Sequence, residues 1–461
     1  MSNWTKQCLV VFTAFTILCT SLNAQIAADA IRISSNEIGF GARALAMGSA
    51  YTAIANDFSA IYWNPAGLAA IPVGGMFAEG VGNSLSNKIT YVGTSTPVTD
   101  QNKHLGAIGL MTALPTIRGS FVIGVGINRI ASYDNYLDFS GLSNVDNGLE
   151  FTFEEDGQYV FYPFNKNVLR SEKVRSIGGV DQISLGVGIA LSPRTAAGLS
   201  ISSVGAREEY IFVFNQKDSE NKYNTYPADF HKYLLTQDLS LEGTSTRIRG
   251  GILSAITPQL KVGATIALPS TFEIAEQHLL KEELTFDDES TTDSTITGFW
   301  EYRLRTPSSI DVGLAFTGSA LTLSTSARLK DWASTQFDLK KLQSGTPLHE
   351  ELKTENRILS ADYRTTVELR AGVEYILRFQ GMALSFRGGY VLIPSSLRDP
   401  DEMDREYFTG GIALSPNQQF IVNLAYLATI WERNSSDKYT PSGTIEELTQ
   451  STIVINATLR L

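Results

Sequence analysis

The chain has 461 residues, a formal net charge of −11 and 18% charged residues. That length suits either two or three soluble domains or one large closed sheet, and the 38 Gly, 18 Tyr and 23 Phe favour the sheet. The acidic balance, with no basic patch, excludes a nucleic-acid-binding role, so we expect no nucleic-acid partner.

The first 24 residues have the layout of a secretory signal peptide. Lys6 supplies the basic start, residues 8–20 form an apolar stretch, and Ala24 ends a plausible cleavage site. A lipoprotein signal at Cys19 is a weaker alternative, because Leu precedes it where a small residue is expected. Removal of the signal takes away both cysteines, so we predict an exported chain without disulfides or cysteine-based chemistry.

From about residue 88 onward, apolar residues alternate with small or polar residues at a period of two. Residues 180–192, 320–330 and 453–461 show this pattern most clearly. A soluble sandwich also alternates, but its water-facing positions usually carry Lys, Glu and Thr rather than Gly, Ser and Ala. No apolar run after the signal is long enough for a transmembrane helix. The pattern therefore predicts an all-β, transmembrane antiparallel β-barrel whose apolar side chains face lipid.

Short and long connections alternate along the chain. Tight turns are predicted at 114–119, 192–195, 257–260, 317–320, 377–381 and 415–418, and long polar loops at 131–179, 215–243, 275–295, 331–360, 394–405 and 433–449. This asymmetry is typical of outer-membrane barrels with short periplasmic turns and long outer loops. With an opening loop near 97–103, the connections give about 14 strands. Residues 73–81 are assigned to the plug or to a bent first strand.

Residues 25–72 differ in composition from the rest of the chain, and we expect them to plug the barrel. A barrel of this size encloses a lumen wider than side chains alone fill. A segment rich in Ala, Gly and Ser packs its backbone closely against a wall of small residues. Its short helix, capped by Asn56 or Asp57, is expected to end at Pro65. The predicted organisation is a signal peptide (1–24), an N-terminal hatch (25–72) and a barrel (73–461).

The sequence GARALAMGSAYTAIANDFSAIYWNPAGLA at 41–69 resembles the N-terminal hatch of the FadL-type outer-membrane transporters of long-chain fatty acids and aromatic hydrocarbons. The residues that carry the resemblance are Gly41, Arg43, Gly48, Asp57, Asn64, Pro65, Ala66 and Gly67. In that family the hatch plugs the barrel, and hydrophobic substrate leaves sideways through a kinked strand beside it. The resemblance implies that Asn64, Pro65 and Ala66 face this opening, although Ser49 stands where a second glycine is common.

The resemblance also implies a function. It indicates a monomer in the Gram-negative outer membrane, in contact with lipid, through which hydrophobic small molecules diffuse passively without a cofactor. A related group of PorV-like barrels with similar hatches works in the type IX protein secretion system, and a role there is the alternative. The chain has no Gly-x-Ser-x-Gly elbow and no histidine in a matching strand, so we expect no enzymatic activity.

Four charged residues fall on the predicted lumen face of their strands: Glu368, Arg370, Glu374 and Arg387. Because buried charges usually pair, we expect these residues to anchor the hatch. Contact with the carboxylate of a substrate is the alternative.

Other polar and aromatic residues carry weaker signals. The histidines at 104, 231, 278 and 349 lack metal-ligand spacing, so we expect surface positions and no metal site. The acidic stretches at 282–293 and 399–404 are interpreted as solvated loops rather than Ca²⁺ sites. Phe212, Phe214, Phe299 and Trp300 are assigned to the aromatic girdle of the barrel, with a substrate-capture site as the alternative.

Overall fold

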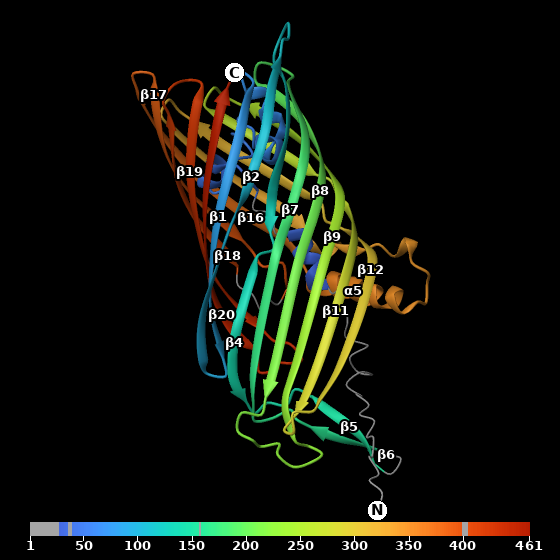
Figure 1. Ribbon diagram of the computed structural model, residues 1–461. Helices are drawn as coiled ribbons and strands as arrows, with labels where there is room; N and C mark the ends of the chain where they lie inside the picture. The colour runs from blue at the N-terminus through green and yellow to red at the C-terminus, as the bar shows by residue number, and fades with distance from the viewer. Residues whose placement is uncertain (1–26, 36–38, 156–157, 399–403) are drawn as a thin grey trace, which may run out of the picture.

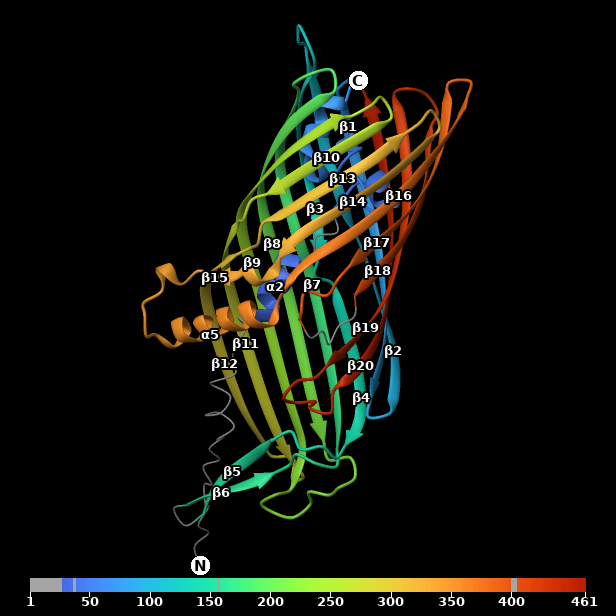
Figure 2. The same cartoon turned by 180° about the vertical axis from the view of Figure 1, so that it is seen from behind.

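The computed structural model describes residues 27–35, 39–155, 158–398 and 404–461 (Figures 1 and 2). The predicted signal peptide, residues 1–24, lies outside the described residues. Most of the described chain is β-strand, and its strands form a closed antiparallel barrel of 14 strands. The predicted fold class is therefore confirmed.

Four of the 14 barrel strands are interrupted, so that each is made of two consecutive segments. In barrel order the strands are β1 (Gly75–Tyr91), β2 (Thr94–Leu114), β3 (Phe121–Ser132) with β4 (Asn135–Ser143), β7 (Val168–Ala190), β8 (Thr195–Lys217), β9 (Phe230–Ala255), β10 (Leu260–Ala267) with β11 (Thr271–Phe286), β13 (Ser309–Thr317) with β12 (Thr291–Arg305), β14 (Leu321–Asp331) with β15 (Gln336–Phe337), β16 (Thr365–Phe379), β17 (Met382–Ile393), β18 (Arg405–Ser415), β19 (Phe420–Ser435) and β20 (Thr444–Arg460). A separate hairpin consists of β5 (Glu150–Glu155) and β6 (Gln158–Pro163).

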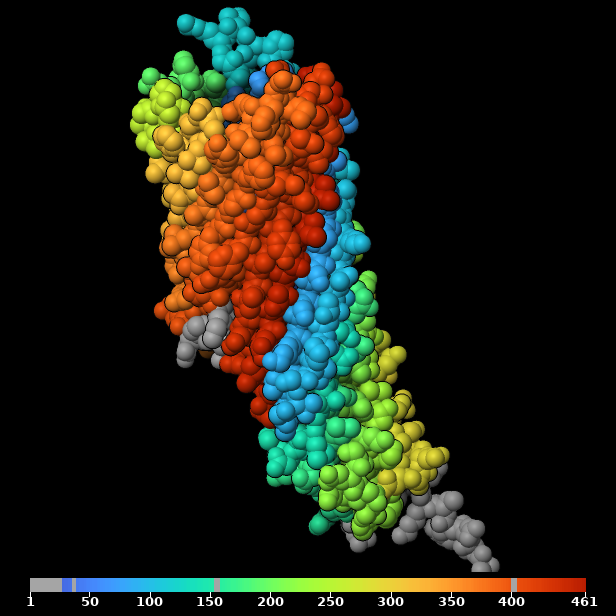
Figure 3. All heavy atoms as spheres, turned by 90° about the vertical axis from the view of Figure 1, so that its left-hand side faces the viewer, coloured from blue at the N-terminus to red at the C-terminus, as the bar shows by residue number. Residues whose placement is uncertain are grey.

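The first and last strands close the barrel. β1 pairs with β20 along its whole length, from Gly75 opposite Arg460 to Tyr91 opposite Thr444. Figure 3 shows this seam, where the red C-terminal strands lie beside the blue first strand. Closure leaves no sheet edge in the wall at this point, as a bilayer requires.

Helical segments precede the barrel and interrupt one of its loops. The helices before the barrel are α2 (Ala27–Ser35), α3 (Ala42–Ala46), α4 (Ala60–Trp63) and the 3₁₀ segment η1 (Pro65–Ala70). The segments η2 (Trp332–Ser334), η3 (Leu339–Lys341) and α5 (Pro347–Asp362) lie in a projection on the side of the barrel (Figure 1). Among the described residues, no helix is both long and apolar enough to cross a bilayer.

Several connections differ from the sequence-based expectation. The six predicted tight turns are short connections in the structure. The predicted opening loop at 97–103 is wrong, because these residues lie within β2 and the first hairpin turns at Val92 and Gly93. Residues 75–81 belong to β1, which carries a bulge between Glu79 and Gly80. The long polar stretches proved to be partly strand, since β7, β8 and β9 cover residues 168–179, 215–217 and 230–243 of the predicted loops.

The chemistry of the outward side chains explains why these strand ends escaped prediction. In β7, the exposed residues near the turn are Ile183 and Leu185, whereas those farther along are Lys173 and Arg175. A change from apolar to charged outward side chains is expected where a barrel leaves the hydrocarbon layer. The barrel therefore has a lipid-facing band at its turn end and a water-facing extension at its loop end, visible as the narrow lower part of Figure 3.

Buried apolar side chains form two clusters inside the barrel. One is built around the N-terminal segment at the turn end. The second, which we call the loop-end cluster, lies in the extension. Its members are Ile89, Tyr91, Leu137, Phe139, Leu149, Phe151, Phe164, Val168, Val174, Phe212, Phe214, Phe230, Tyr233, Leu235, Leu280, Leu284, Phe286 and Tyr439. The interior thus holds an apolar cluster at each level, alongside buried polar and charged side chains.

Candidate functional site

The N-terminal segment lies inside the barrel and touches its wall where the wall is glycine. A Cβ on Gly389 of β17 would lie 2.1 Å from the Gly48 nitrogen, and a Cβ on Gly198 of β8 would lie 2.2 Å from the Pro65 carbonyl carbon. Gly48 itself has φ +59°, which favours glycine. We call residues 39–71 the hatch. Its backbone can approach the wall this closely only because the wall has no side chains at these points.

Asn64 is the polar centre of the hatch and is completely buried. Its Nδ2 donates to the carbonyl oxygens of Thr52 (2.7 Å) and Ile252 (3.1 Å), and its Oδ1 accepts from the Ala66 nitrogen (3.1 Å). One amide therefore joins two parts of the hatch to β9. Through these contacts and those of Pro65, the structure places the Asn-Pro-Ala motif against β8 and β9.

The other hatch residues of the sequence motif have separate roles. Asp57 accepts hydrogen bonds from the Ser59 nitrogen (2.9 Å) and the Tyr51 hydroxyl (2.9 Å), which organises the start of α4. Gly41 has φ +99° and donates its N–H to Glu79 Oε1 of β1 (3.1 Å). A Cβ on Gly67 would overlap the Ala55 carbonyl oxygen at 1.8 Å.

A bidentate ion pair fastens the hatch to the wall. Arg43 donates from Nε and Nη2 to the two carboxylate oxygens of Glu374, at 2.9 and 2.7 Å. Glu374 also accepts from Arg387 Nε at 2.7 Å, and its side chain is 1% exposed. We call Arg43, Glu374 and Arg387 the hatch latch. Paired, planar contacts of this kind fix orientation as well as charge.

The other two lumen candidates belong to a different network. Arg370 donates to Glu368 and lies 3.4 Å from Asp311 Oδ1, which also accepts from Arg328 Nε at 2.8 Å. The Arg370 guanidinium lies 5.5 Å from the ring centroid of Trp63 in the hatch. The four predicted residues are therefore divided between two groups. Asp311 and Arg328 were not singled out, although Arg328 falls on the polar face of the predicted strand 320–330.

The third barrel strand is broken beside the hatch. β3 ends at Ser132 and β4 begins at Asn135, with an irregularity between Arg129 and Ala131 in the pairing to β7. β2 pairs with β3 only from Ala107 to Leu114. Within the described residues, β4 pairs with β7 and no ladder joins it to β2. The wall therefore lacks backbone hydrogen bonds between β2 and β4.

Side chains bridge this break in place of a ladder. Asp134, in the interruption, accepts from Asn102 Nδ2 of β2 (2.5 Å), the Ser132 hydroxyl (2.6 Å) and the Gly178 nitrogen (3.3 Å). On the lumen side, Gly39 of the hatch donates its N–H to the Ile130 carbonyl at 3.4 Å. The break thus lies between the hatch and the outside of the barrel.

The space beside the break is almost filled. A cavity of about 20 Å³ remains, lined by hatch residues Phe40 and Leu45 together with Ile130 of β3 and His104 of β2. Such a volume holds about one water molecule. A larger solute passes only if the hatch or the bridging side chains move, so this arrangement is a closed one.

Helix α2 lies between the hatch and the loop-end cluster (Figure 2). Arg32 donates to Glu208 of β8 and to Asp29 (3.1 Å), and its guanidinium lies 5.3 Å from the ring centroid of Tyr133 at the strand break. The Ala27 nitrogen donates to Glu355 of α5 at 2.7 Å. The helix is therefore tied both to the wall and to the projecting segment.

Two groups of sequence-based assignments need correction. Phe212 and Phe214 are buried in the loop-end cluster and do not belong to an outward girdle, whereas Phe299 is 57% exposed. His278 is not a surface residue: it is buried against Trp300, with Nε2 2.8 Å from Glu276 Oε1. His278 lies in the stretch 275–295 that was predicted as a loop, whereas Phe212 and Phe214 were predicted in a strand but on its outward face. Among the described residues, no group of three or more potential ligands is arranged to hold a metal ion.

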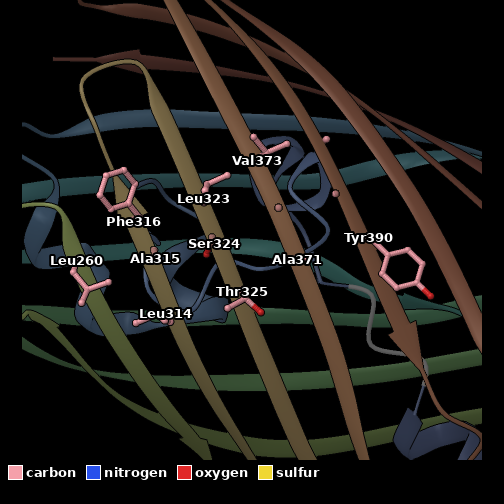
Figure 4. Close-up of a pocket in the computed structure, with 13 residues that line it drawn as sticks. Leu260, Leu314, Ala315, Phe316, Leu323, Ser324, Thr325, Ala371, Val373 and Tyr390 are labelled. Carbon is pink, nitrogen blue, oxygen red and sulfur yellow. The ribbon is translucent and has the colours of Figure 1, made fainter.

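An open hollow of about 510 Å³ lies on the outside of the wall across β13, β14 and β16. Its rim is formed by the exposed side chains of Leu314, Phe316, Leu323 and Val373, and Ala371 also lines it. Figure 4 shows these side chains on the strands, with the N-terminal segment behind them. The hollow faces the lipid side of the band and is separated from the lumen by the sheet.

Comparisons with known proteins agree with this geometry. No family model and no curated protein matches the chain. Solved structures do match: a Pseudomonas aeruginosa FadL homologue (TM-score 0.58, 12% identity, 92% of this chain and 99% of that one), the monoaromatic hydrocarbon channel CymD (0.55, 13%, 92% and 98%) and the Ralstonia pickettii toluene transporter TbuX (0.53, 16%, 92% and 98%). At these identities the likeness shows the fold, and the predicted FadL-type resemblance is confirmed at that level.

Proposed function

We propose that this protein is a channel of the Gram-negative outer membrane that passes hydrophobic small molecules, such as monoaromatic hydrocarbons or long-chain fatty acids. One observation carries the proposal: the wall lacks a β2–β4 ladder where the hatch meets it, and a cluster of buried apolar side chains lies on each side of that level. A channel for hydrophilic solutes has a polar, water-filled lumen instead. The named substrates of CymD and TbuX support the same class.

In this proposal the solute follows a defined route. It enters from the loop end, which faces outward, and partitions into the loop-end cluster. It then passes α2 and leaves sideways between β2 and β4 into the bilayer when the hatch contact at Ile130 opens. The flux follows the gradient of the solute, and no covalent step is involved. In this proposal residues 25–72, which include α2 and the hatch at 39–71, plug the barrel of residues 73–461, and the mature monomer lacks residues 1–24.

A reversible staple across the break tests the route. Cysteines replacing Asn102 and Asp134, whose side chains are hydrogen-bonded, would join β2 to the interruption in an oxidised double variant. We expect uptake of toluene and of a fluorescent fatty acid to fall at least about tenfold and to recover on reduction, because the exit is closed. The matched control is Lys88→Cys with Glu447→Cys, which links positions already paired between β1 and β20.

The outcome separates the alternatives. Normal uptake by the oxidised Asn102→Cys, Asp134→Cys protein would show that solute does not leave through the break. Loss of uptake in the Lys88→Cys, Glu447→Cys control would show that oxidation itself is harmful. Uptake of only one of the two probes would identify the substrate class.

The second candidate is a component of a type IX protein secretion system. It is favoured by the segment that carries η2, η3 and α5, which projects from the side of the barrel and offers a surface for another protein (Figure 1). This role predicts that exported proteins co-purify with the chain and that the staple leaves their secretion unchanged. Absence of such proteins from the purified material, together with blocked uptake, would exclude it.

A further inference from the structure

The connection between β19 and β20 turns one of its aromatic side chains into the barrel. Tyr439 is 8% exposed, and its ring stacks on Phe214 with 4.9 Å between centroids and an interplanar angle of 27°. The Phe212 ring lies 5.8 Å away. By contrast, Tyr226 in another loop at the same end is 74% exposed. Tyr439 therefore occupies an interior position built by β8.

Polar contacts hold the loop in this position. Asp437 Oδ1 accepts from the nitrogens of Tyr439 (2.8 Å) and Thr440 (2.7 Å), which shapes the turn. Asn147 Nδ2 donates to the Tyr439 carbonyl at 3.1 Å, and the Thr440 hydroxyl lies 3.2 Å from Glu172 Oε2 of β7. The ring is thus placed by a specific local structure rather than by apolar contact alone.

The anchor at Glu172 is a carboxyl group surrounded by other acids. Burial raises the pKa of Glu172 to about 9, and the neighbouring Asp437 adds to this effect. Glu446 and the Tyr210 hydroxyl also face it, and Glu446 is itself paired with Arg433. Glu172 lies in the water-facing extension, where Lys173 and Arg175 are the exposed outward residues. The closed loop therefore favours the protonated form of Glu172.

The position filled by the Tyr439 ring has the chemistry of a ligand site. Its walls include Phe212 and Phe214, and Tyr233 lies behind Phe214 with 6.3 Å between ring centroids. Aromatic rings favour stacked and edge-to-face neighbours, so this environment suits another flat, apolar ring. Dry apolar cavities of about 150 Å³ are known to bind benzene. A single unsubstituted aromatic ring matches the part of the side chain that is buried here.

We infer that the Tyr439 side chain occludes a binding site for a single aromatic ring at the loop end of the barrel. A ligand binds there only when the 436–443 loop lifts, so the apparent affinity is lowered by the fraction of molecules in which the loop is open. The part of this inference that concerns uptake rests on the proposed function, because this would be the first site at which an entering solute binds. The ring site itself is independent of where the solute leaves.

Binding of fluorobenzene to the purified protein in detergent, followed by fluorine NMR, tests the inference. Tyr439→Ala empties the site and is expected to bind the probe at least about tenfold more tightly than the wild type. Tyr439→Phe keeps the ring and is expected to bind like the wild type. Tyr226→Ala removes an exposed tyrosine and serves as the matched control.

Two further variants keep the test valid if Tyr439→Ala does not fold. Asn147→Ala and Thr440→Val each loosen the loop while Phe212 and Phe214 remain in place, so smaller gains in affinity are expected. If every variant that retains the barrel circular dichroism spectrum binds fluorobenzene no better than the wild type, the inference is wrong. A gain in binding combined with uptake that survives the β2–β4 staple would leave the ring site standing and remove the proposed exit route.

Discussion

The hatch latch offers the sharpest quantitative prediction. Replacing Arg43 by Met removes two charge-assisted hydrogen bonds to Glu374, a carboxylate whose side chain is 1% exposed. Hydrogen bonds to charged groups contribute roughly 1.5–3 kcal/mol each, and an unpaired buried charge costs more. Arg387 stays bound to Glu374 and the Arg43 side chain is 20% exposed, which lowers the loss. We expect the hatch to be destabilised by about 3 kcal/mol.

A loss of this size has a measurable consequence. About 3 kcal/mol corresponds to roughly a 100-fold increase in the population of the open hatch. Amide hydrogen exchange in residues 39–71 should accelerate by that factor, while exchange in the strands of the loop end stays unchanged, because hatch opening is a local event. Exchange measured by mass spectrometry on detergent-solubilised Arg43→Met and wild-type protein provides the comparison.

The matched control removes one partner of an ion pair whose side chains are exposed to solvent. Lys88 and Glu447 form an ion pair at 2.7 Å whose side chains are 51% and 50% exposed. Exposed pairs contribute about 1 kcal/mol or less, so Lys88→Met should change hatch exchange by at most a few-fold. If Arg43→Met exchanges within about threefold of the wild type, or if both variants behave alike, the latch does not hold the hatch.

Two other predictions concern the hatch contact and the loop. Gly389→Val should displace residues 46–48 from the wall and lower the midpoint of thermal unfolding in detergent, because a Cβ there would lie 2.1 Å from the Gly48 nitrogen. Gly205→Ala should have little effect on this midpoint, because no heavy atom lies within 4 Å of the added Cβ. Equal midpoints for the two variants would contradict the close packing. For Glu172, the pKa is raised to about 9 in the closed loop, so the stabilisation of the closed loop is complete below the ordinary value near 4.5 and is lost as pH rises towards 9. Proteolytic nicking of 436–443 should therefore increase between pH 5 and 9 in the wild type and be independent of pH in Glu172→Gln; a pH-independent wild type would refute the assignment.

Local sequence patterns determined the class of fold. Alternation with a period of two places Leu185 and Ile189 outward and Ser184 inward whatever the neighbouring strands are, because successive side chains of a strand point to opposite faces. Tight turns are likewise local, so their positions followed from short polar interruptions. The same local rule failed in the loop-end extension, where outward residues such as Arg175 face water and resemble loop residues.

Tertiary structure alone decided which residues meet. Arg43 and Glu374 are separated by 331 positions. Asn102 of β2 bonds to Asp134 in the interruption between β3 and β4, where the wall lacks a ladder. The inward turn of Tyr439 depends on β7 and β8, which precede it by more than two hundred residues. A periodic pattern assigns each side chain to a face of the sheet but carries no information on its neighbour across the lumen. Closure of the barrel brings those faces together, and with them the latch, the break and the ring site.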